Sequence, residues 1–187
     1  MKDFILHRRH SLSKDKCNSI IDYFETHKEF HCLGTAGGRE VDPSQKISTE
    51  IILSFRNSEV SSIFGEFLKE VVDVYKKQYP FIDEGVDSWN IDDVFKIQKY
   101  NPHEGYFALH CENTGHLEPS KRILAWMIYL NDVTDGGHTE FPSQNRKFQP
   151  RRGDILLWPA YFTHPHKGIT SKSQTKYIIT GWYSHFR

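Results

Sequence analysis

Five short runs of aromatic and β-branched residues in the second half of the chain constrain the fold more than any other feature. They cover residues 94–100, 105–111, 123–130, 154–158 and 176–183. Turn-forming pairs such as Asn101-Pro102 and Gly136-Gly137 lie between them, so each run has the length and flanks of a β-strand. Many short strands at this spacing predict a sandwich or a barrel.

The first half of the chain shows helical periodicity instead. Ser13 is placed to cap a helix whose apolar positions fall within residues 17–24. From Val60 to Tyr75 apolar residues recur at helical spacing, and this second helix must end before Pro80. Helices followed by strands predict the α+β class, with the helices supporting one sheet.

The size of the chain, 187 residues, fits a single domain over residues 1–187. Within it we expect mostly helical support and a loop in residues 1–88, and the catalytic β core in residues 89–187. The loop is predicted from the glycines and the proline of residues 34–44. The sequence does not indicate an oligomeric state.

Charge and cysteine content exclude several classes of protein. Lys plus Arg and Asp plus Glu both number 24, so no basic excess points to a nucleic-acid partner. The sequence has no apolar run of about 18 residues, so we expect no membrane span. Three widely spaced cysteines form no disulfide framework, which favours a reducing, cytoplasmic location, or the host cytoplasm if the protein is viral.

The chemistry is indicated by His110-Cys111-Glu112, with His166 further along the chain. If residues 110–112 are in a strand, His110 and Glu112 point to the same face. Two histidines and one carboxylate would leave open positions on a metal, which suits Fe(II) and oxygen chemistry. An isolated HxE match is weak evidence, because it also occurs by chance as a polar pair at a strand edge.

The surroundings of this motif make it specific. They include, in order, Tyr100-Asn101-Pro102, Tyr129-Leu130-Asn131, Gly136-Gly137, Phe141-Pro142, His166-Lys167-Gly168 and Lys176. This ordered set resembles the Fe(II)- and 2-oxoglutarate-dependent oxygenases of the prolyl 4-hydroxylase-like branch. The resemblance extends from about residue 90 to the end of the chain, and the N-terminal helices fit the support that this family gives its barrel.

The resemblance implies a double-stranded β-helix, or jelly roll, with Fe(II), 2-oxoglutarate and O2 as cofactor and cosubstrates. By position, His110, Glu112 and His166 would bind Fe(II), and Lys176 would pair with the distal carboxylate of 2-oxoglutarate. Such a buried cation offsets the desolvation of the carboxylate opposite it.

Four further residues of the site follow from the same resemblance. Tyr129 matches a tyrosine that contacts 2-oxoglutarate, and Tyr100 matches one near the cosubstrate or substrate. Trp182 and Thr180 share a strand face with Lys176 by period-two counting, so Thr180 could touch the cosubstrate. Core packing is the alternative role for both tyrosines and for Trp182.

Two features of the sequence leave alternatives open. His164 rivals His166 as the distal ligand, although His166 fits the spacing to Lys176 better. Glu112 stands where the peptidyl-prolyl hydroxylases have Asp, which weakens a strict assignment to them but not the oxygenase activity.

The resemblance predicts hydroxylation of an sp3 carbon, with a prolyl or other side chain of a protein or peptide as the first hypothesis. Hydroxylation of a free amino acid or small metabolite is the second, and a catalytically silent jelly-roll binding module is the third. We expect substrate choice to depend on residues 33–48 and 113–121. If Tyr100 faces the pocket, Gln98 and Lys96 on the same strand face can hold a polar substrate.

Overall fold

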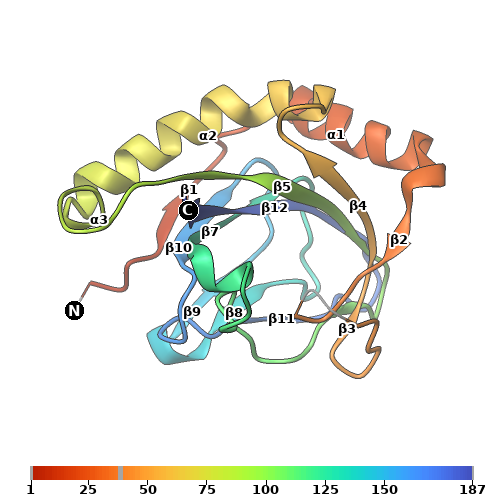
Figure 1. Ribbon diagram of the computed structural model, residues 1–187. Coiled ribbons are helices and arrows are strands. Elements are labelled where there is room, and N and C mark those ends of the chain that lie inside the picture. The colour runs from red at the N-terminus through yellow and green to blue at the C-terminus, as the bar shows by residue number, and fades with distance from the viewer. Residues whose placement is uncertain (1, 38–39, 187) are drawn as a thin grey trace.

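In residues 2–37 and 40–186, which this computed structural model describes, seven strands form one antiparallel sheet (Figure 1). Their order across the sheet is β1-β10-β7-β12-β5-β4-β2. In chain order they are β1 (Leu6–Arg8), β2 (Cys32–Leu33), β4 (Thr49–Ser54), β5 (Trp89–Tyr100), β7 (Arg122–Tyr129), β10 (Ile155–Pro159) and β12 (Lys176–His185).

Shorter strands lie opposite this sheet and form the second layer (Figure 1). They are β3 (Lys46–Ile47) paired with β6 (Gly105–Tyr106), and β8 (Thr139–Phe141) between β9 (Arg146–Phe148) and β11 (Lys167–Gly168). One-turn 3-10 helices occur at Lys28–Phe30, Pro119–Lys121 and Pro142–Gln144. The two layers make the predicted jelly roll, in the predicted α+β class.

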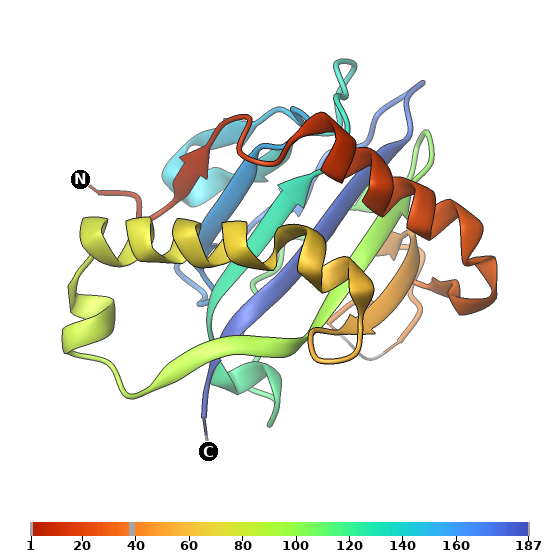
Figure 2. The same cartoon turned by 90° about the horizontal axis from the view of Figure 1, so that it is seen from above.

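The helices cover the outer face of the large sheet, as Figure 2 shows from above. Those that cover it are α1 (Lys14–Thr26) and α2 (Glu59–Gln78), whereas the single-turn α3 (Phe81–Glu84) follows α2 and lies to one side of the sheet. Ser13 caps α1 by accepting a hydrogen bond from the amide of Lys16, and α2 ends before Pro80, so both predictions are confirmed. Among the described residues, no helix combines the length and the apolar character needed to cross a bilayer.

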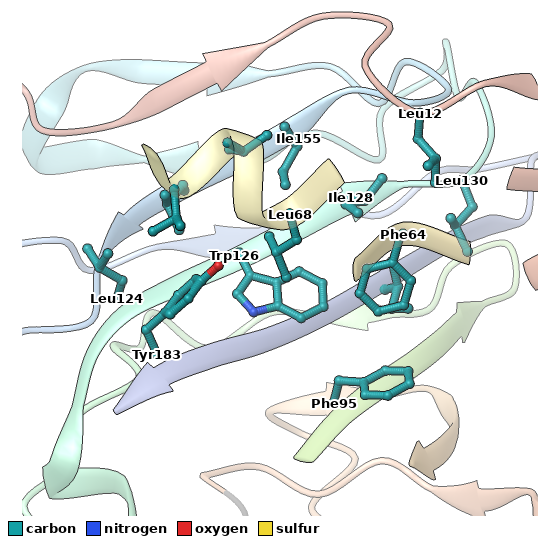
Figure 3. Close-up of a cluster of buried hydrophobic side chains, with 14 of the residues drawn as sticks. Leu12, Phe64, Leu68, Phe95, Leu124, Trp126, Ile128, Leu130, Ile155 and Tyr183 are labelled. Atoms are coloured by element: carbon teal, nitrogen blue, oxygen red, sulfur yellow. The ribbon is translucent and has the colours of Figure 1, made fainter. Parts of the chain in front are cut away.

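Strand β7 is buried on both faces because it lies between the helices and the second layer. Its side chains alternate: Trp126 faces α2, whereas Met127 belongs to the inner cluster against the second layer. Trp126 packs on Phe64 with ring centroids 5.5 Å apart, at the centre of the cluster in Figure 3. The outer core therefore fixes the large sheet against the helices and leaves its inner face free to line a site.

Gly181 on β12 offers a test of this packing. A Cβ added there would lie 2.5 Å from Cζ2 of the fully buried Trp126 ring. Overpacking of this kind costs about 1–3 kcal/mol, so we expect Gly181→Ala to lower the free energy of unfolding by that amount in urea titrations. Gly65 in α2 has open space at its Cβ, and Gly65→Ala should instead stabilise by about 0.5–1 kcal/mol. Equal effects of the two changes would contradict this account of the core.

The first half of the chain also contains strands that the sequence did not indicate, and one of the expected strands is mostly absent. Residues 1–88 contribute β1, β2, β3 and β4 in addition to the helices and the loop. These strands are short, and β4 contains a buried Glu50 that breaks its apolar pattern. The run 105–111 forms a regular strand only at Gly105–Tyr106, because the chain then leaves the ladder.

Candidate active site

A cavity of about 390 Å³ lies between the two layers and contains the predicted metal ligands. His110 comes from the segment after β6, and His166 lies just before β11. Their backbones form an isolated bridge: the amide of His110 donates to the carbonyl of His166 at 3.0 Å, and the reverse bond is 2.8 Å. The predicted HxE strand is therefore not formed as a regular strand. The backbone bridge between the two distant segments still turns His110 and His166 into the cavity.

The ligand atoms of His110, Glu112 and His166 converge in this cavity and all lie within 4.8 Å of one another. Oε1 of Glu112 is 3.7 Å from Nε2 of His110 and 3.3 Å from Nε2 of His166. Two imidazole nitrogens and one carboxylate oxygen meeting at one point match the donor set of an Fe(II) oxygenase site.

The hydrogen bonds behind the histidines make this set suitable for a metal. Nδ1 of His110 lies 2.9 Å from the carbonyl of Ala108, and Nδ1 of His166 lies 3.1 Å from the carbonyl of His164. Because a carbonyl oxygen only accepts, each Nδ1 must bear the proton and each Nε2 presents a lone pair. The residues present therefore fit an Fe(II) ion.

The protonation states also favour metal binding. Burial lowers the pKa of His110, and the neighbouring His166 lowers it further, which favours the neutral imidazole. The other oxygen of Glu112 faces the indole N–H of Trp182 and the guanidinium of Arg122, and both favour the ionised carboxylate. Neutral imidazoles and an ionised carboxylate are the forms that bind a metal ion.

The second oxygen of Glu112 is held by Trp182 and Arg122. Nε1 of Trp182 donates to Oε2 at 2.8 Å, and a guanidinium nitrogen of Arg122 lies 3.7 Å from the same oxygen. The Arg122 guanidinium also stacks over the Trp182 ring at 3.6 Å. Trp182 thus orients the metal carboxylate in addition to forming part of the cavity wall.

Removal of this indole hydrogen bond should weaken metal binding without unfolding the protein. We expect Trp182→Phe to lower Fe(II) affinity about 10- to 100-fold, as is usual when an outer partner of a metal ligand is lost. Anaerobic calorimetric titration with Fe(II) would measure this, and Trp89→Phe provides a control far from the metal ligands. Unchanged affinity in Trp182→Phe would remove the orienting role.

Lys176 lies elsewhere in the same cavity and is 5% exposed. Its ammonium donates to the carbonyl of Gly137 at 3.0 Å and lies 4.8 Å from the centroid of the Tyr100 ring. Burial lowers its pKa to about 8. Among the described residues no carboxylate lies within ion-pair distance of it, so this cation is available for the carboxylate of a bound molecule.

The other predicted cosubstrate residues differ in their access to the cavity. Tyr100 and Thr180 line it; the Tyr100 hydroxyl donates to Gln98 and the Thr180 hydroxyl donates to the carbonyl of Trp126. Tyr129 is fully buried, and its hydroxyl donates to Thr139, which itself lines the cavity. Contact of these three residues with 2-oxoglutarate stays a prediction.

The rival ligand His164 points away from the metal cluster. Its Nε2 lies 2.8 Å from the carbonyl of Asp3 and its Nδ1 lies 2.9 Å from the hydroxyl of Thr163. The structure therefore places His166, and not His164, with His110 and Glu112.

Both loops expected to influence substrate choice reach the cavity. Thr35 and Gly37 come from one loop, and Thr114 and Pro119 come from the other. Residues 38 and 39 of the first loop lie outside the described residues.

Sequence reasoning missed Arg122, Lys46 and Tyr106, which also line the cavity. Tyr106 stacks on the His110 ring with centroids 3.6 Å apart. A basic residue at the start of a strand and an aromatic near HxE are too common to be diagnostic. Only the fold brings them to the ligands.

Comparison with known proteins agrees with this site. Residues 95–184 match the model of the 2OG-Fe(II) oxygenase superfamily. A protein of Acanthamoeba polyphaga mimivirus, provisionally named a prolyl 4-hydroxylase, is 27% identical over 97% of this chain and 74% of its own length. Prolyl 4-hydroxylase 13 of Arabidopsis thaliana is 22% identical, with 91% of this chain and 67% of that protein covered.

A solved structure shares the fold at low identity. The viral collagen prolyl hydroxylase of Paramecium bursaria Chlorella virus-1, in complex with 2OG, superposes with a TM-score of 0.72 at 18% identity, covering 98% of this chain and 97% of that one. The ligand set, the matched family model and these relatives agree. The ligand set and the matched model identify residues 95–184 as a 2OG-Fe(II) oxygenase domain, and the chain as a whole is similar to prolyl 4-hydroxylases.

Proposed function

We propose that this 2-oxoglutarate-dependent dioxygenase hydroxylates a prolyl side chain of a protein or peptide. The observation that supports it most is the presence of two complementary groups in one cavity. One is the His110, Glu112 and His166 cluster, and the other is the buried, carboxylate-free ammonium of Lys176. A silent binding module has no use for this combination, because burying an ammonium without a counter-ion is unfavourable.

Each residue has a defined task in this proposal. His110, Glu112 and His166 would hold Fe(II), and Lys176 would bind the distal carboxylate of 2-oxoglutarate. When bound, iron and 2-oxoglutarate supply the oxidation, in which O2 is consumed, 2-oxoglutarate becomes succinate and CO2, and a substrate C–H becomes C–OH. The walls of the cavity orient the substrate carbon and keep bulk water away.

A peptide substrate is supported by the relatives. Of the two curated relatives described above, the Arabidopsis thaliana protein is named a prolyl 4-hydroxylase, and the mimivirus protein is provisionally named one. A prolyl hydroxylase from Trichoplax adhaerens with the same fold, at a TM-score of 0.74 and 15% identity, was solved with a hypoxia-inducible factor peptide.

The test is succinate formation by the purified protein with Fe(II), 2-oxoglutarate and O2, with and without proline-containing peptides. We expect peptide to accelerate succinate formation, with one hydroxylated peptide detected by mass spectrometry for each succinate. Acceleration by a free amino acid but by no peptide would instead establish the small-metabolite function.

A further inference from the structure

A buried charge cluster made of Lys46, Glu50 and Lys96 lies beside the metal site, and neither iron nor 2-oxoglutarate accounts for it. Glu50 on β4 is 1% exposed, and its Oε1 accepts a hydrogen bond from Lys46, which is 4% exposed. Its Oε2 accepts from Lys96 at 3.0 Å. Both lysines line the cavity, and the buried Glu50 contacts both of them.

Gln98 joins this cluster to the predicted cosubstrate pocket. Nε2 of Gln98 donates to Oε1 of Glu50 at 2.7 Å, and Oε1 of Gln98 accepts from the Tyr100 hydroxyl at 3.0 Å. The Tyr100 ring in turn faces the ammonium of Lys176. The lysines are therefore fixed in position relative to the site by a continuous set of hydrogen bonds.

The cluster lies near the open side of the cavity. On β12, Lys176 pairs with Tyr100, whereas Thr180, nearer to Trp182, pairs with Lys96. Ile52, the partner of Lys96 on β4, is 53% exposed and also lines the cavity. Lys96 therefore lies at the level of the cavity where Trp182 holds the metal carboxylate and where the wall is exposed to solvent, which is where a substrate would enter.

The charges of the cavity do not balance without a further anion. Fe(II) and the dianion 2-oxoglutarate cancel each other. Within the described residues, the cationic side chains that line the cavity, the histidines aside, are Lys46, Lys96, Arg122 and Lys176. Glu50 and Glu112 offset two of them, which leaves two positive charges in a partly desolvated space. Such a space concentrates anions.

Stability of the fold alone does not explain the cluster. Burial lowers the pKa of Lys46, and the attraction of Glu50 offsets this only in part. Buried ion pairs of this kind are often replaceable by apolar residues without loss of stability. A cluster that faces a cavity with one carboxylate for two ammonium groups is better explained by a ligand that supplies a second carboxylate.

We propose that the Lys46–Glu50–Lys96 cluster is a substrate subsite that binds a carboxylate close to the carbon to be hydroxylated. This inference rests on the proposed function and specifies its substrate class. Two sources supply the same chemistry: an acidic side chain next to the target residue of a peptide, or the α-carboxylate of a free amino acid. Both place a negative charge between Lys96 and the metal.

The first experiment uses the wild-type enzyme with matched substrates. Proline peptides with Glu moved along both sides of the proline are compared with their Gln counterparts, and free proline is compared with prolinamide. We expect kcat/KM from succinate formation to be at least about tenfold higher for the acid in one of these arms, since charged hydrogen bonds are strong. Equal rates for acid and amide would overturn the subsite alone, whereas no acceleration by any compound would overturn the proposed function with it.

The second experiment assigns the effect to the cluster. Lys96→Met should reduce the acid-to-amide ratio of kcat/KM to near one by raising KM for the acid, and Lys96→Glu should favour peptides with Lys at that position. Lys99→Met is the matched control, because Lys99 lies on the same strand but pairs with Glu25 on the opposite face at 2.7 Å. A ratio that persists in Lys96→Met, or falls equally in Lys99→Met, would overturn the assignment. The wild-type comparison remains decisive if a Lys96 variant does not fold.

Discussion

Substitution of Lys176 by Met is expected to stabilise the free protein while removing its affinity for 2-oxoglutarate. Burial lowers the pKa of Lys176 from 10.5 to about 8, so below pH 8 the folded protein holds a desolvated ammonium that the unfolded chain keeps in water. This pKa shift corresponds to a destabilisation of about 3 kcal/mol, which the substitution removes. The substitution also removes the hydrogen bond to Gly137, and that loss costs about 1 kcal/mol of stability. We expect a net gain of about 2 kcal/mol in urea unfolding at pH 7.

The sign of the pH dependence follows from the same shift. Between about pH 8 and 10.5 the unfolded chain binds the proton more tightly than the folded protein, so stability contributed by this site rises with pH across that window. Lys176→Met should remove this rise. Lys172→Met, an exposed change in the preceding loop, is the control and should leave it in place.

The loss of 2-oxoglutarate binding is the second part of this prediction. Removing one partner of a buried charge pair typically weakens binding about 100-fold or more. In the wild type, affinity should also fall as pH rises above about 8, because Lys176 then loses its proton in the free protein. Lys176→Arg retains a charge at all these pH values and should not show that fall. Tight 2-oxoglutarate binding by Lys176→Met would refute the anchoring role.

Replacement of His166 by Ala is expected to abolish Fe(II) binding, with a loss of affinity greater than the 10- to 100-fold typical of outer partners. Anaerobic titration of Fe(II) with 2-oxoglutarate, followed by the visible charge-transfer band, measures this directly. His164→Ala is the matched control: Nδ1 of His166 bonds to the backbone carbonyl of residue 164, which the substitution leaves in place. Loss of the band in His164→Ala, or its survival in His166→Ala, would reassign the distal ligand.

Much of the fold could be predicted because its longer elements have strong periodicity. The helices capped by Ser13 and ended before Pro80 were predicted from local patterns, as were β7 and β12. The short strands β1, β2 and β3 could not be, because two or three residues carry no readable period and their pairing is set by distant segments. The same limit applies to the HxE segment, whose partner is His166.

The site was predictable where its residues follow one another in a known order, and not where the fold alone joins them. His110, Glu112 and Lys176 belong to such an order. The bond between Trp182 and Glu112 joins positions far apart in the chain, and no local pattern predicts it. Glu50 is a more difficult case, because a charged residue in a strand normally indicates exposure, yet here two lysines compensate its burial.

The paired backbone bonds between His110 and His166 have a practical consequence for anyone handling the protein. Two of the three metal ligands are joined by main-chain bonds that do not require the ion, unlike those of small zinc domains that fold only when loaded. A chelator should therefore strip the iron and leave the circular dichroism spectrum of the folded protein nearly unchanged. A well-folded preparation is consequently no indication of metal content, and the iron in each batch has to be quantified before an inactive sample is interpreted.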